Sequence, residues 1–185
     1  MTTAAYIKAS FTGIGFAGIA GVALAIGMLL PSVAHAEIDL ETKVKAAYLY
    51  NFTKFVDWPN LPPDSLRICV VGNDPVGGML GELSNRQVKE RPLKIEVNTP
   101  MDIALCQVLF ISRSEKKWED ILGRLRGAGV LTVGDQNGFA RSGGVVGFYS
   151  EGGKIKLEIN PAAARSANLK ISAKLMELSR TVPLP

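Results

Sequence analysis

The chain has 185 residues, with 21 Lys and Arg residues against 17 Asp and Glu residues, and a formal net charge of +4. This length fits one domain with a hydrophobic core. The basic residues are scattered rather than gathered in blocks, so the charge gives no support for nucleic-acid binding. The single histidine is His35. If the N-terminal segment that contains it is removed, Ser/His/Asp catalysis, Cys/His catalysis and His-ligated metal sites are excluded.

Residues 1–36 have the layout of a secretory signal peptide. Lys8 is the only charged residue in this segment, an apolar run covers about residues 11–30, and the segment closes with the small-residue pattern A-x-A. We therefore expect cleavage after Ala36 and a mature domain of residues 37–185. An uncleaved membrane anchor is the alternative, because the apolar run is long for a signal peptide.

A helix rich in aromatic residues is predicted from about residue 39 to residue 56, with a proline at position 59 to end it. Its apolar stripe consists of residues at steps of four, four and three: Val44, Tyr48, Phe52 and Phe55. We expect Phe52 and Phe55 to pack in the core, where the helix covers one face of a sheet.

Two aromatic residues of this segment are candidates for contact with another protein. Tyr50 lies off the main stripe and Trp58 lies at the end of the helix. Tyr and Trp are favoured anchors of protein interfaces. The sequence therefore predicts Tyr50 and Trp58 as partner-binding residues.

Strands and helices alternate after the aromatic helix. The predicted strands cover residues 66–72, 93–97, 106–112 and 129–135, and the predicted helices cover residues 76–83 and 114–127. Ser114 is the expected N-cap and Gly127 the expected stop of the second of these helices. This alternation is typical of a parallel sheet covered by helices.

The last third of the chain differs in texture. Two strands flank Glu151-Gly152-Gly153 and predict a β-hairpin, and a helical tail is expected at about residues 162–180. The predicted fold is therefore a single α/β domain. It has a mixed, mostly parallel sheet flanked by helices, with a C-terminal β-hairpin and helix.

The turn from Gly72 to Gly78 lies where a nucleotide-binding loop would lie, between a strand and a helix. It lacks the Lys-Ser/Thr of a phosphate loop and the G-x-G-x-x-G of a dinucleotide fold. We interpret it as a tight turn. A small anion at the start of the following helix is the alternative, and it would make the protein a periplasmic small-ligand binder. No motif in the sequence points to a cofactor, a metal site or an enzymatic activity.

Cys69 and Cys106 are the only cysteines, and their separation excludes a C-x-x-C redox motif. In an exported protein such a pair indicates a structural disulfide. The bridge would close a loop of 37 residues and stabilise the fold by about 4 kcal/mol in the chain-entropy treatment. Two unpaired buried thiols are the alternative.

Five segments, in this order, resemble the YfiR family of periplasmic proteins. They are VKAAYLYNFTKFVDWP (44–59), LRICVVGNDP (66–75), CQVLFIS (106–112), GVLTVGD (129–135) and the C-terminal pair KIKLEIN (154–160) and AARSANLKISAKLMELS (163–179). Together they span almost the whole of the expected mature chain.

The resemblance implies a regulator rather than an enzyme. It implies that the protein binds the periplasmic sensing domain of an inner-membrane diguanylate cyclase and represses it, which lowers cyclic-di-GMP and biofilm formation. It further implies sequestration by an outer-membrane, peptidoglycan-associated lipoprotein, and a capacity to form homodimers. The disulfide carries over to Cys69 and Cys106, but this chain lacks a second cysteine pair near residues 143–150. That difference puts a redox-switch role in doubt.

Overall fold

The structure of the protein is a computed structural model that describes residues 33–73, 75–84, 86–98 and 102–182. The signal peptide expected at residues 1–36 lies almost wholly outside these residues, so its cleavage remains a prediction. Within the described ranges, no helix is long and apolar enough to span a bilayer.

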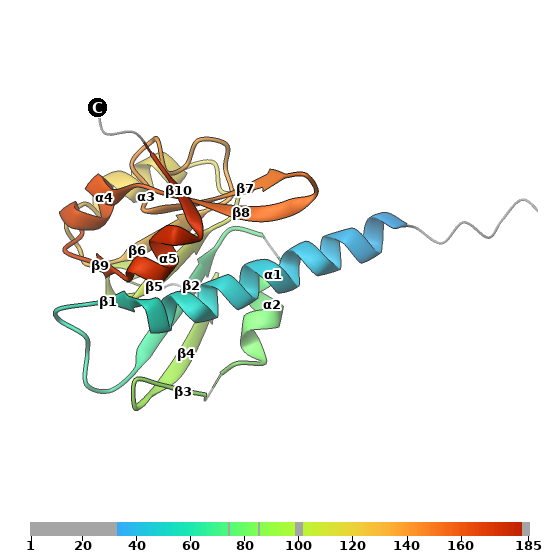
Figure 1. Cartoon of the computed structure of the whole chain (residues 1–185). Helices are drawn as coiled ribbons and strands as arrows, with labels where there is room; N and C mark the ends of the chain where they lie inside the picture. The colour runs from blue at the N-terminus through green and yellow to red at the C-terminus, as the bar shows by residue number, and fades with distance from the viewer. Residues whose placement is uncertain (1–32, 74, 85, 99–101, 183–185) are drawn as a thin grey trace, which may run out of the picture. The chain divides into compact units, whose positions relative to one another are not determined.

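A mixed sheet of eight strands forms the centre of the described domain (Figure 1). Its strands in chain order are β2 (Leu66–Val71), β3 (Gln87–Val88), β4 (Arg91–Val97), β5 (Val108–Ile111), β6 (Leu131–Gly134), β7 (Val146–Glu151), β8 (Lys154–Ile159) and β10 (Ser179–Thr181). Across the sheet they follow the order β10-β8-β7-β6-β5-β2-β4-β3. Only the β7–β8 and β3–β4 pairs of this sheet are antiparallel. The mostly parallel α/β sheet predicted from the sequence is therefore confirmed.

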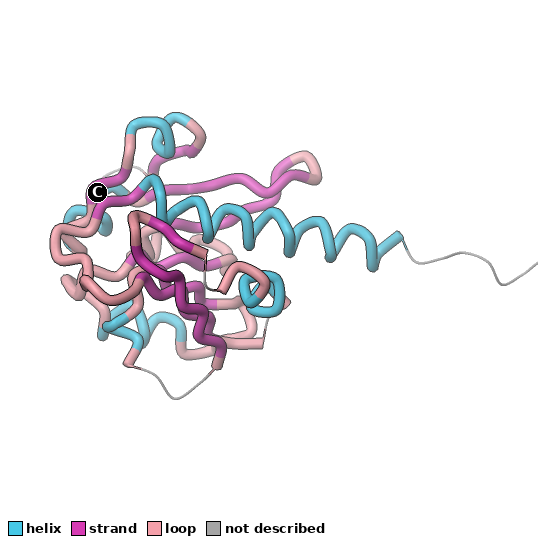
Figure 2. Tube along the Cα trace, turned by 90° about the horizontal axis from the view of Figure 1, so that it is seen from below, coloured by secondary structure: helices cyan, strands magenta, loops and turns pink. Residues whose placement is uncertain are grey.

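The helices cover both faces of the sheet. Helix α1 (Val33–Phe55) packs on one face together with the short helices α2 (Val76–Gly81) and α5 (Ala173–Glu177). Helix α3 (Trp118–Arg124) covers the other face. Helix α4 (Pro161–Ser166) follows β8 and adds Ala164 to the core under α1. The N-terminal half of α1 lies beside the β7–β8 hairpin, which projects past the ends of its neighbours (Figures 1 and 2).

Two apolar cores result from the alternation of side chains along the central strands. On β5, Val108 and Phe110 point toward α1, whereas Leu109 and Ile111 point toward α3, and all four are buried. The fully apolar sequence of this strand reflects its burial on both faces. The hairpin turns at Gly152 and Gly153, whose φ angles of +59° and +68° suit a type I′ turn.

Helix α1 confirms the predicted core role of its aromatic residues. Phe52 is fully buried, and Phe55 packs against the same core from a half-buried position. The helix begins at Val33, earlier than the expected residue 39, and it ends at Phe55. Its most buried residues are Thr42, Lys45, Ala46, Leu49, Phe52 and Thr53. The buried face is thus rotated from the expected stripe and contains a lysine.

The prediction of a long C-terminal helix at residues 162–180 is wrong. Asn168 adopts φ +56° just after α4 and ends that helix in a left-handed conformation. The chain then forms strand β9 (Lys170–Ile171), which pairs with β1 (Val56–Asp57) at the end of α1. Helix α5 and strand β10 follow. The helix predicted here would have bonded its backbone groups locally. In the structure, the backbone of β9 and β10 bonds to distant strands instead.

The helix expected at residues 114–127 is shorter than predicted. Helix α3 begins at Trp118, and its N-cap Lys117 makes no side-chain capping bond. Ser114 is therefore not the N-cap. Its Oγ accepts a hydrogen bond from the backbone N–H of Asn73 at 2.7 Å instead. Gly127 lies beyond the helix end at φ +75°.

Candidate functional site

The strand order reverses between β2 and β5, because β2 has β4 on one side and β5 on the other. Loops after such neighbouring strands leave the sheet in opposite directions, and the carboxyl ends of these strands are where α/β proteins usually bind ligands. Three loops meet this edge: Gly72–Asn73 after β2, 112–114 after β5, and Asp135–Gln136 after β6.

Side chains already occupy the backbone donors of the loop after β2. The N–H of Gly72 donates to Asn98 Oδ1 at 2.9 Å, and Asn98 Nδ2 donates back to the Gly72 carbonyl at 2.9 Å. The N–H of Asn73 donates to Ser114. Gly77 is buried, and a Cβ there would lie 2.9 Å from Val97 Cγ1. Within the described residues of the Gly72–Gly78 turn, these contacts serve packing and give no support to the anion-site alternative.

A buried ion pair joins helix α1 to the loop after β6. Lys45 Nζ lies 2.6 Å from Asp135 Oδ2, and these two side chains are 5% and 2% exposed. Lys45 Nζ also lies 2.7 Å from Glu41 Oε1 one helical turn away. The Arg113 backbone N–H donates to Asp135 Oδ1 at 2.7 Å, and its Nε lies 3.3 Å from Oδ2. Asp135 therefore fastens α1, the loop after β5 and the loop after β6 together.

The electrostatics of Lys45 favour its charged form. Burial lowers the pKa of Lys45, but hydrogen bonds to Asp135 and Glu41 and the charges of both carboxylates outweigh burial and raise the pKa above 10.5. The pair spans 90 residues of sequence. A lysine held by two carboxylates in this way fastens the helix to the loop after β6.

Sequence reasoning missed Lys45 and Asp135. Asp135 is the last residue of the strand predicted at residues 129–135, and Lys45 lies within the predicted aromatic helix, and neither residue was assigned a role. One signal was available: both residues stand where an apolar run is expected to be buried, Asp135 directly after strand β6 and Lys45 one residue after Val44 of the stripe. A charge in such a place needs a partner of opposite sign.

The two predicted partner-binding residues occupy different environments. The Tyr50 ring packs against the core from a half-buried position, and Lys54 Nζ lies 4.2 Å from its centroid. Trp58 is only 8% exposed and belongs to the core. Its indole Nε1 is buried without a hydrogen-bond partner in the described structure. Partner contact through either residue remains a prediction.

Trp58 also lines a cavity of about 270 Å³ at the amino ends of β5 and β6. Its wall includes Leu105, at the end of the 3-10 helix η1 (Ile103–Leu105), and this side chain is 53% exposed. Cys106 lies on the same wall. A partner at this place would touch Leu105 directly and would reach Trp58 only through the cavity.

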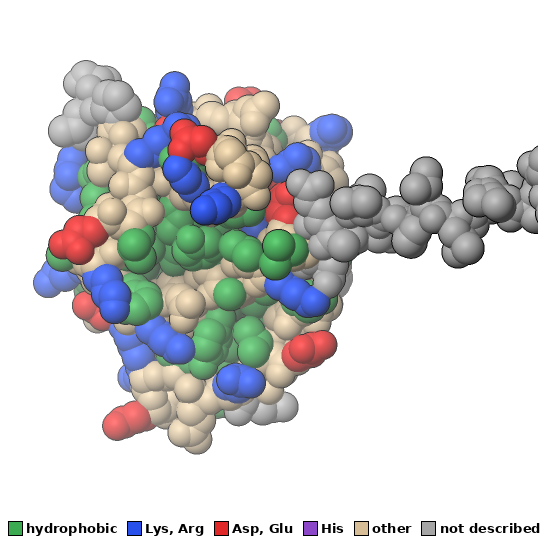
Figure 3. All heavy atoms as spheres, turned by 45° about the vertical axis from the view of Figure 1, so that its right-hand side comes forward, with side chains coloured by type: hydrophobic (Ala, Val, Ile, Leu, Met, Phe, Trp, Pro, Cys, Tyr) green, Lys and Arg blue, Asp and Glu red, His purple; other side chains and the backbone are tan. Residues whose placement is uncertain are grey.

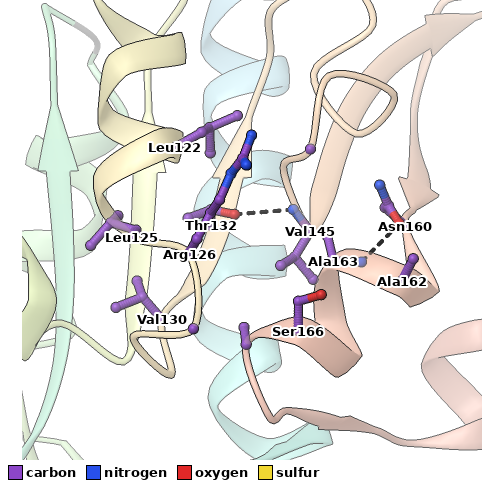
Figure 4. A pocket seen from close by; sticks show the side chains of 13 residues that line it. Leu122, Leu125, Arg126, Val130, Thr132, Val145, Asn160, Ala162, Ala163 and Ser166 are labelled. Carbon is purple, nitrogen blue, oxygen red and sulfur yellow. Dashed lines mark hydrogen bonds between the residues drawn. The ribbon is translucent and has the colours of Figure 1, made fainter.

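A second cavity, of about 380 Å³, lies between α3 and α4 (Figure 4). Its polar groups are mostly engaged in local hydrogen bonds: Thr132 Oγ1 accepts from the Val145 N–H at 3.0 Å, and Asn160 Oδ1 accepts from the Ala163 N–H at 2.9 Å. Arg126 stands over this cavity. These bonds hold the loops around α4 in place, and they leave few polar groups available to a molecule in the cavity.

Cys69 and Cys106 are joined by a disulfide, with Cα atoms 6.0 Å apart. Cys69 lies in β2 and Cys106 just before β5, and both are buried in the core under α3. Because β2 and β5 are neighbours in the sheet, the bridge connects strands that already pair. Its position within a buried core is that of a structural bridge.

Figure 3 shows apolar side chains gathered in the middle of one face, bordered by Lys and Arg side chains. The half-buried apolar residues that pack around α1 and its neighbours include Tyr48, Tyr50, Phe55, Met79, Ile155, Ile171 and Met176. Leu40 and Leu178 are exposed outright. Apolar groups of this kind on a surface are typical of protein interfaces.

Among the described residues, no group of three or more His, Cys, Asp or Glu side chains could hold a metal ion.

The sequence comparison identifies the family. A family profile described as YfiR/HmsC-like matches residues 42–180. The chain belongs to the YfiR/HmsC-like family. A search of curated proteins found no match. Membership of this family indicates a regulatory protein of diguanylate cyclase signalling, and the matched range runs from Thr42 within α1 to Arg180 within β10.

Proposed function

We propose that the protein is a periplasmic repressor that binds the periplasmic sensing domain of an inner-membrane diguanylate cyclase and holds that enzyme inactive. Cyclic-di-GMP and biofilm formation then stay low. The observation that carries this proposal is the YfiR/HmsC-like match over residues 42–180. The apolar surface around α1 supports it, because a regulator without a reaction of its own acts through contact.

Repression requires a difference in affinity between the two states of the cyclase. A protein that binds the active and inactive states equally shifts nothing, however tightly it binds. To move the cyclase from 99% active to 99% inactive, the repressor must bind the inactive state roughly 10⁴-fold more tightly. An outer-membrane, peptidoglycan-associated lipoprotein that binds the repressor would lower its free concentration and release the cyclase.

Tyr50 and the rim of the Trp58 cavity are the proposed contacts. Tyr50 offers a half-buried ring on α1, and Leu105 offers an exposed apolar side chain beside Trp58. Trp58 itself supports this rim from the core. Replacing Trp58 with Ala would disturb packing by about 3–5 kcal/mol, so it is unsuitable as a test of contact.

The experiment combines gene deletion with complementation. Deletion should raise cellular cyclic-di-GMP and surface attachment, and the wild-type gene should lower both again. Genes carrying Tyr50→Ala or Leu105→Glu should complement poorly although the proteins are folded by circular dichroism. Tyr149→Ala serves as the matched control, because Tyr149 is a half-buried tyrosine on β7 covered by Arg180.

The partner itself can be recovered with tagged mature protein from solubilised envelope. A membrane protein with a diguanylate cyclase domain should be enriched with the wild type and reduced with Leu105→Glu. Unchanged cyclic-di-GMP after deletion in every growth condition, together with no cyclase in the recovered fraction, would reject the repressor role.

A further inference from the structure

The cavity that Trp58 lines, of about 270 Å³, lies at the amino ends of β5 and β6, at the edge of the sheet opposite to the Gly72–Gly78 turn. Four segments that are far apart in the sequence enclose it: the chain after α1, helix η1, the turn after α3 and the end of α4. Trp58 and Gln107 are buried and form part of its floor, whereas Asn60 and Ala128 are exposed and form part of its mouth. The cavity is therefore open to solvent above a packed floor.

No charged side chain is present among the described residues that line this cavity. A charged ligand inside it would lose part of its hydration without gaining a partner of opposite sign. The volume lies just below the roughly 300–1,000 Å³ of pockets for drug-sized ligands. The cavity therefore suits an uncharged molecule of about the size of a single substituted ring.

Three amide side chains supply the polar side chains of the described lining: Asn60, Gln107 and Asn168. The amides of Asn60 and Asn168 form no hydrogen bond with a described residue. Gln107 is held in place, because its Oε1 accepts the Arg67 N–H at 2.8 Å and its Nε2 donates to the Leu105 carbonyl at 3.2 Å. A side-chain amide both donates and accepts hydrogen bonds, and a hydroxyl group does the same. These amides therefore match a ligand that carries hydroxyl groups.

The remaining walls are largely apolar. Trp58, Pro59, Pro62 and Leu105 provide carbon surface beside the amides. A sugar ring carries C–H groups on its faces and hydroxyl groups around its edge, so one molecule of this kind satisfies both types of wall. Pockets with apolar walls and a few placed polar groups are the usual form of small-ligand sites.

We propose that this cavity binds one ring of a neutral sugar. The sugar hydroxyls bond to Asn60 and Asn168 at the mouth and to Gln107 at the floor, and the C–H faces pack against Trp58 and the prolines. Binding is weak and reversible, because each neutral hydrogen bond contributes little net free energy in water. This inference does not rest on the proposed repression of a cyclase.

The indole N–H signals of the two tryptophans test the site by NMR. Trp58 lines the cavity, whereas Trp118 packs against the core under α3 and serves as an internal reference. Titration of isotope-labelled mature protein with glucose and with N-acetylglucosamine should shift the Trp58 signal and leave the Trp118 signal in place. Glucuronic acid and glucosamine carry a charge on a similar ring and should shift neither signal. The variant Trp118→Phe assigns the two signals.

Two substitutions remove an amide while the backbone conformation is kept. Asn60→Ala changes an exposed turn residue, and Asn168→Gly suits the φ of +56° at that position. Each should weaken sugar binding about fivefold, since one hydrogen bond is lost. Asn137→Ala is the matched control, because it removes an exposed amide from the turn after β6, and it should change nothing. Circular dichroism checks the fold of each variant.

The source of the sugar can be distinguished with the linear trimer of N-acetylglucosamine. Clearly tighter binding of the trimer than of the monomer would indicate that a glycan chain lies across the mouth of the cavity. Equal affinity would indicate that a free sugar fills the site. Both results support the site itself.

Any of four results would overturn the proposal. The Trp58 signal could stay in place with every sugar at its highest soluble concentration. Charged sugars could shift it as much as neutral ones, which would contradict the role of the uncharged lining. Asn60→Ala and Asn168→Gly could both bind sugar as Asn137→Ala does, which would place the sugar elsewhere. Indole could shift the Trp58 signal when no sugar does, which would assign the cavity to an apolar side chain of a partner protein.

Discussion

At the scale of single residues, the Lys45–Asp135 pair is the most consequential feature. It is buried between α1 and the sheet, and its two carboxylate oxygens also bind Arg113. Removing one member of a buried pair leaves a charge without compensation, which costs far more than the pair contributes when intact. The pair therefore sets the position of α1 along the sheet.

We expect Lys45→Met to lower the free energy of unfolding by about 3 kcal/mol, because the Asp135 carboxylate would keep only Arg113. The double variant Lys45→Met/Asp135→Leu should recover part of this loss, since no buried charge is then unpaired. Urea unfolding followed by circular dichroism measures both, with the exposed Lys116→Met as control. Equal effects of Lys45→Met and Lys116→Met would contradict the interpretation.

The raised pKa of Lys45 predicts a pH dependence at high pH. The folded state holds the proton of Lys45 more tightly than the unfolded chain, in which the pKa is near 10.5. The resulting stabilisation is fully present below that value and is lost as pH rises through the higher pKa of the folded state. The difference in unfolding free energy between wild type and Lys45→Met should thus be constant from about pH 8 to about pH 10 and shrink above it. A difference that grows with pH would refute this sign.

At the scale of elements, the segment between β6 and β7 is folded around one aromatic ring. Phe139 is buried, its ring centroid lies 5.6 Å from that of Trp118, and a Cβ at Gly134 or Gly144 would overlap the ring. Two glycines thus make room for the ring on β6 and just before β7. The same segment carries Asp135 to Lys45.

Gly144→Ala should lower the free energy of unfolding by about 1–3 kcal/mol, because the added methyl group displaces the Phe139 ring from a packed core. Gly123→Ala is the matched control in α3, where a Cβ meets no atom within 4 Å. There we expect stabilisation by about 0.5–1 kcal/mol, since alanine favours helix over glycine. Thermal or urea unfolding distinguishes the two signs, and a neutral Gly144→Ala would show that the loop repacks freely.

At the scale of the whole domain, one sheet supports both apolar cores. Trp58 belongs to the core under α1, and Trp118 packs against the core under α3. Central strands such as β5 contribute alternate side chains to each core. Neither core can therefore open without loss of strand pairs that the other core needs.

Each tryptophan can report on its own core, because the chain has only these two. We expect the fluorescence of the remaining tryptophan in Trp58→Phe and in Trp118→Phe to follow the same urea transition as far-UV circular dichroism of that variant. A fluorescence midpoint clearly below the circular dichroism midpoint in one variant would show that the core it reports opens first.

Local patterns predicted much of this domain. The hairpin, the alternating strands and helices and the burial of Phe52 all depend on residues that are close together in sequence or follow a short period. The disulfide was predicted on another ground, because Cys69 and Cys106 are 37 residues apart and are the only cysteines of a chain expected to be exported. Such patterns predict structure reliably because the period of the apolar side chains and the turn residues determine the backbone conformation of only a few neighbouring positions. The prediction of a C-terminal helix was wrong for the opposite reason, since β9 and β10 form their hydrogen bonds with strands that are far away in the chain.

The sequence by itself determined the α/β class, the family membership of residues 42–180 and the apolar strands that form the sheet. Only the tertiary structure decided which charges meet. Lys45 and Asp135 are 90 residues apart, and the sequence around either residue does not indicate which residue it pairs with. The edges of the sheet, at β10 and β3, are likewise a result of strand order, because a strand becomes an edge only when the rest of the sheet has formed on its other side.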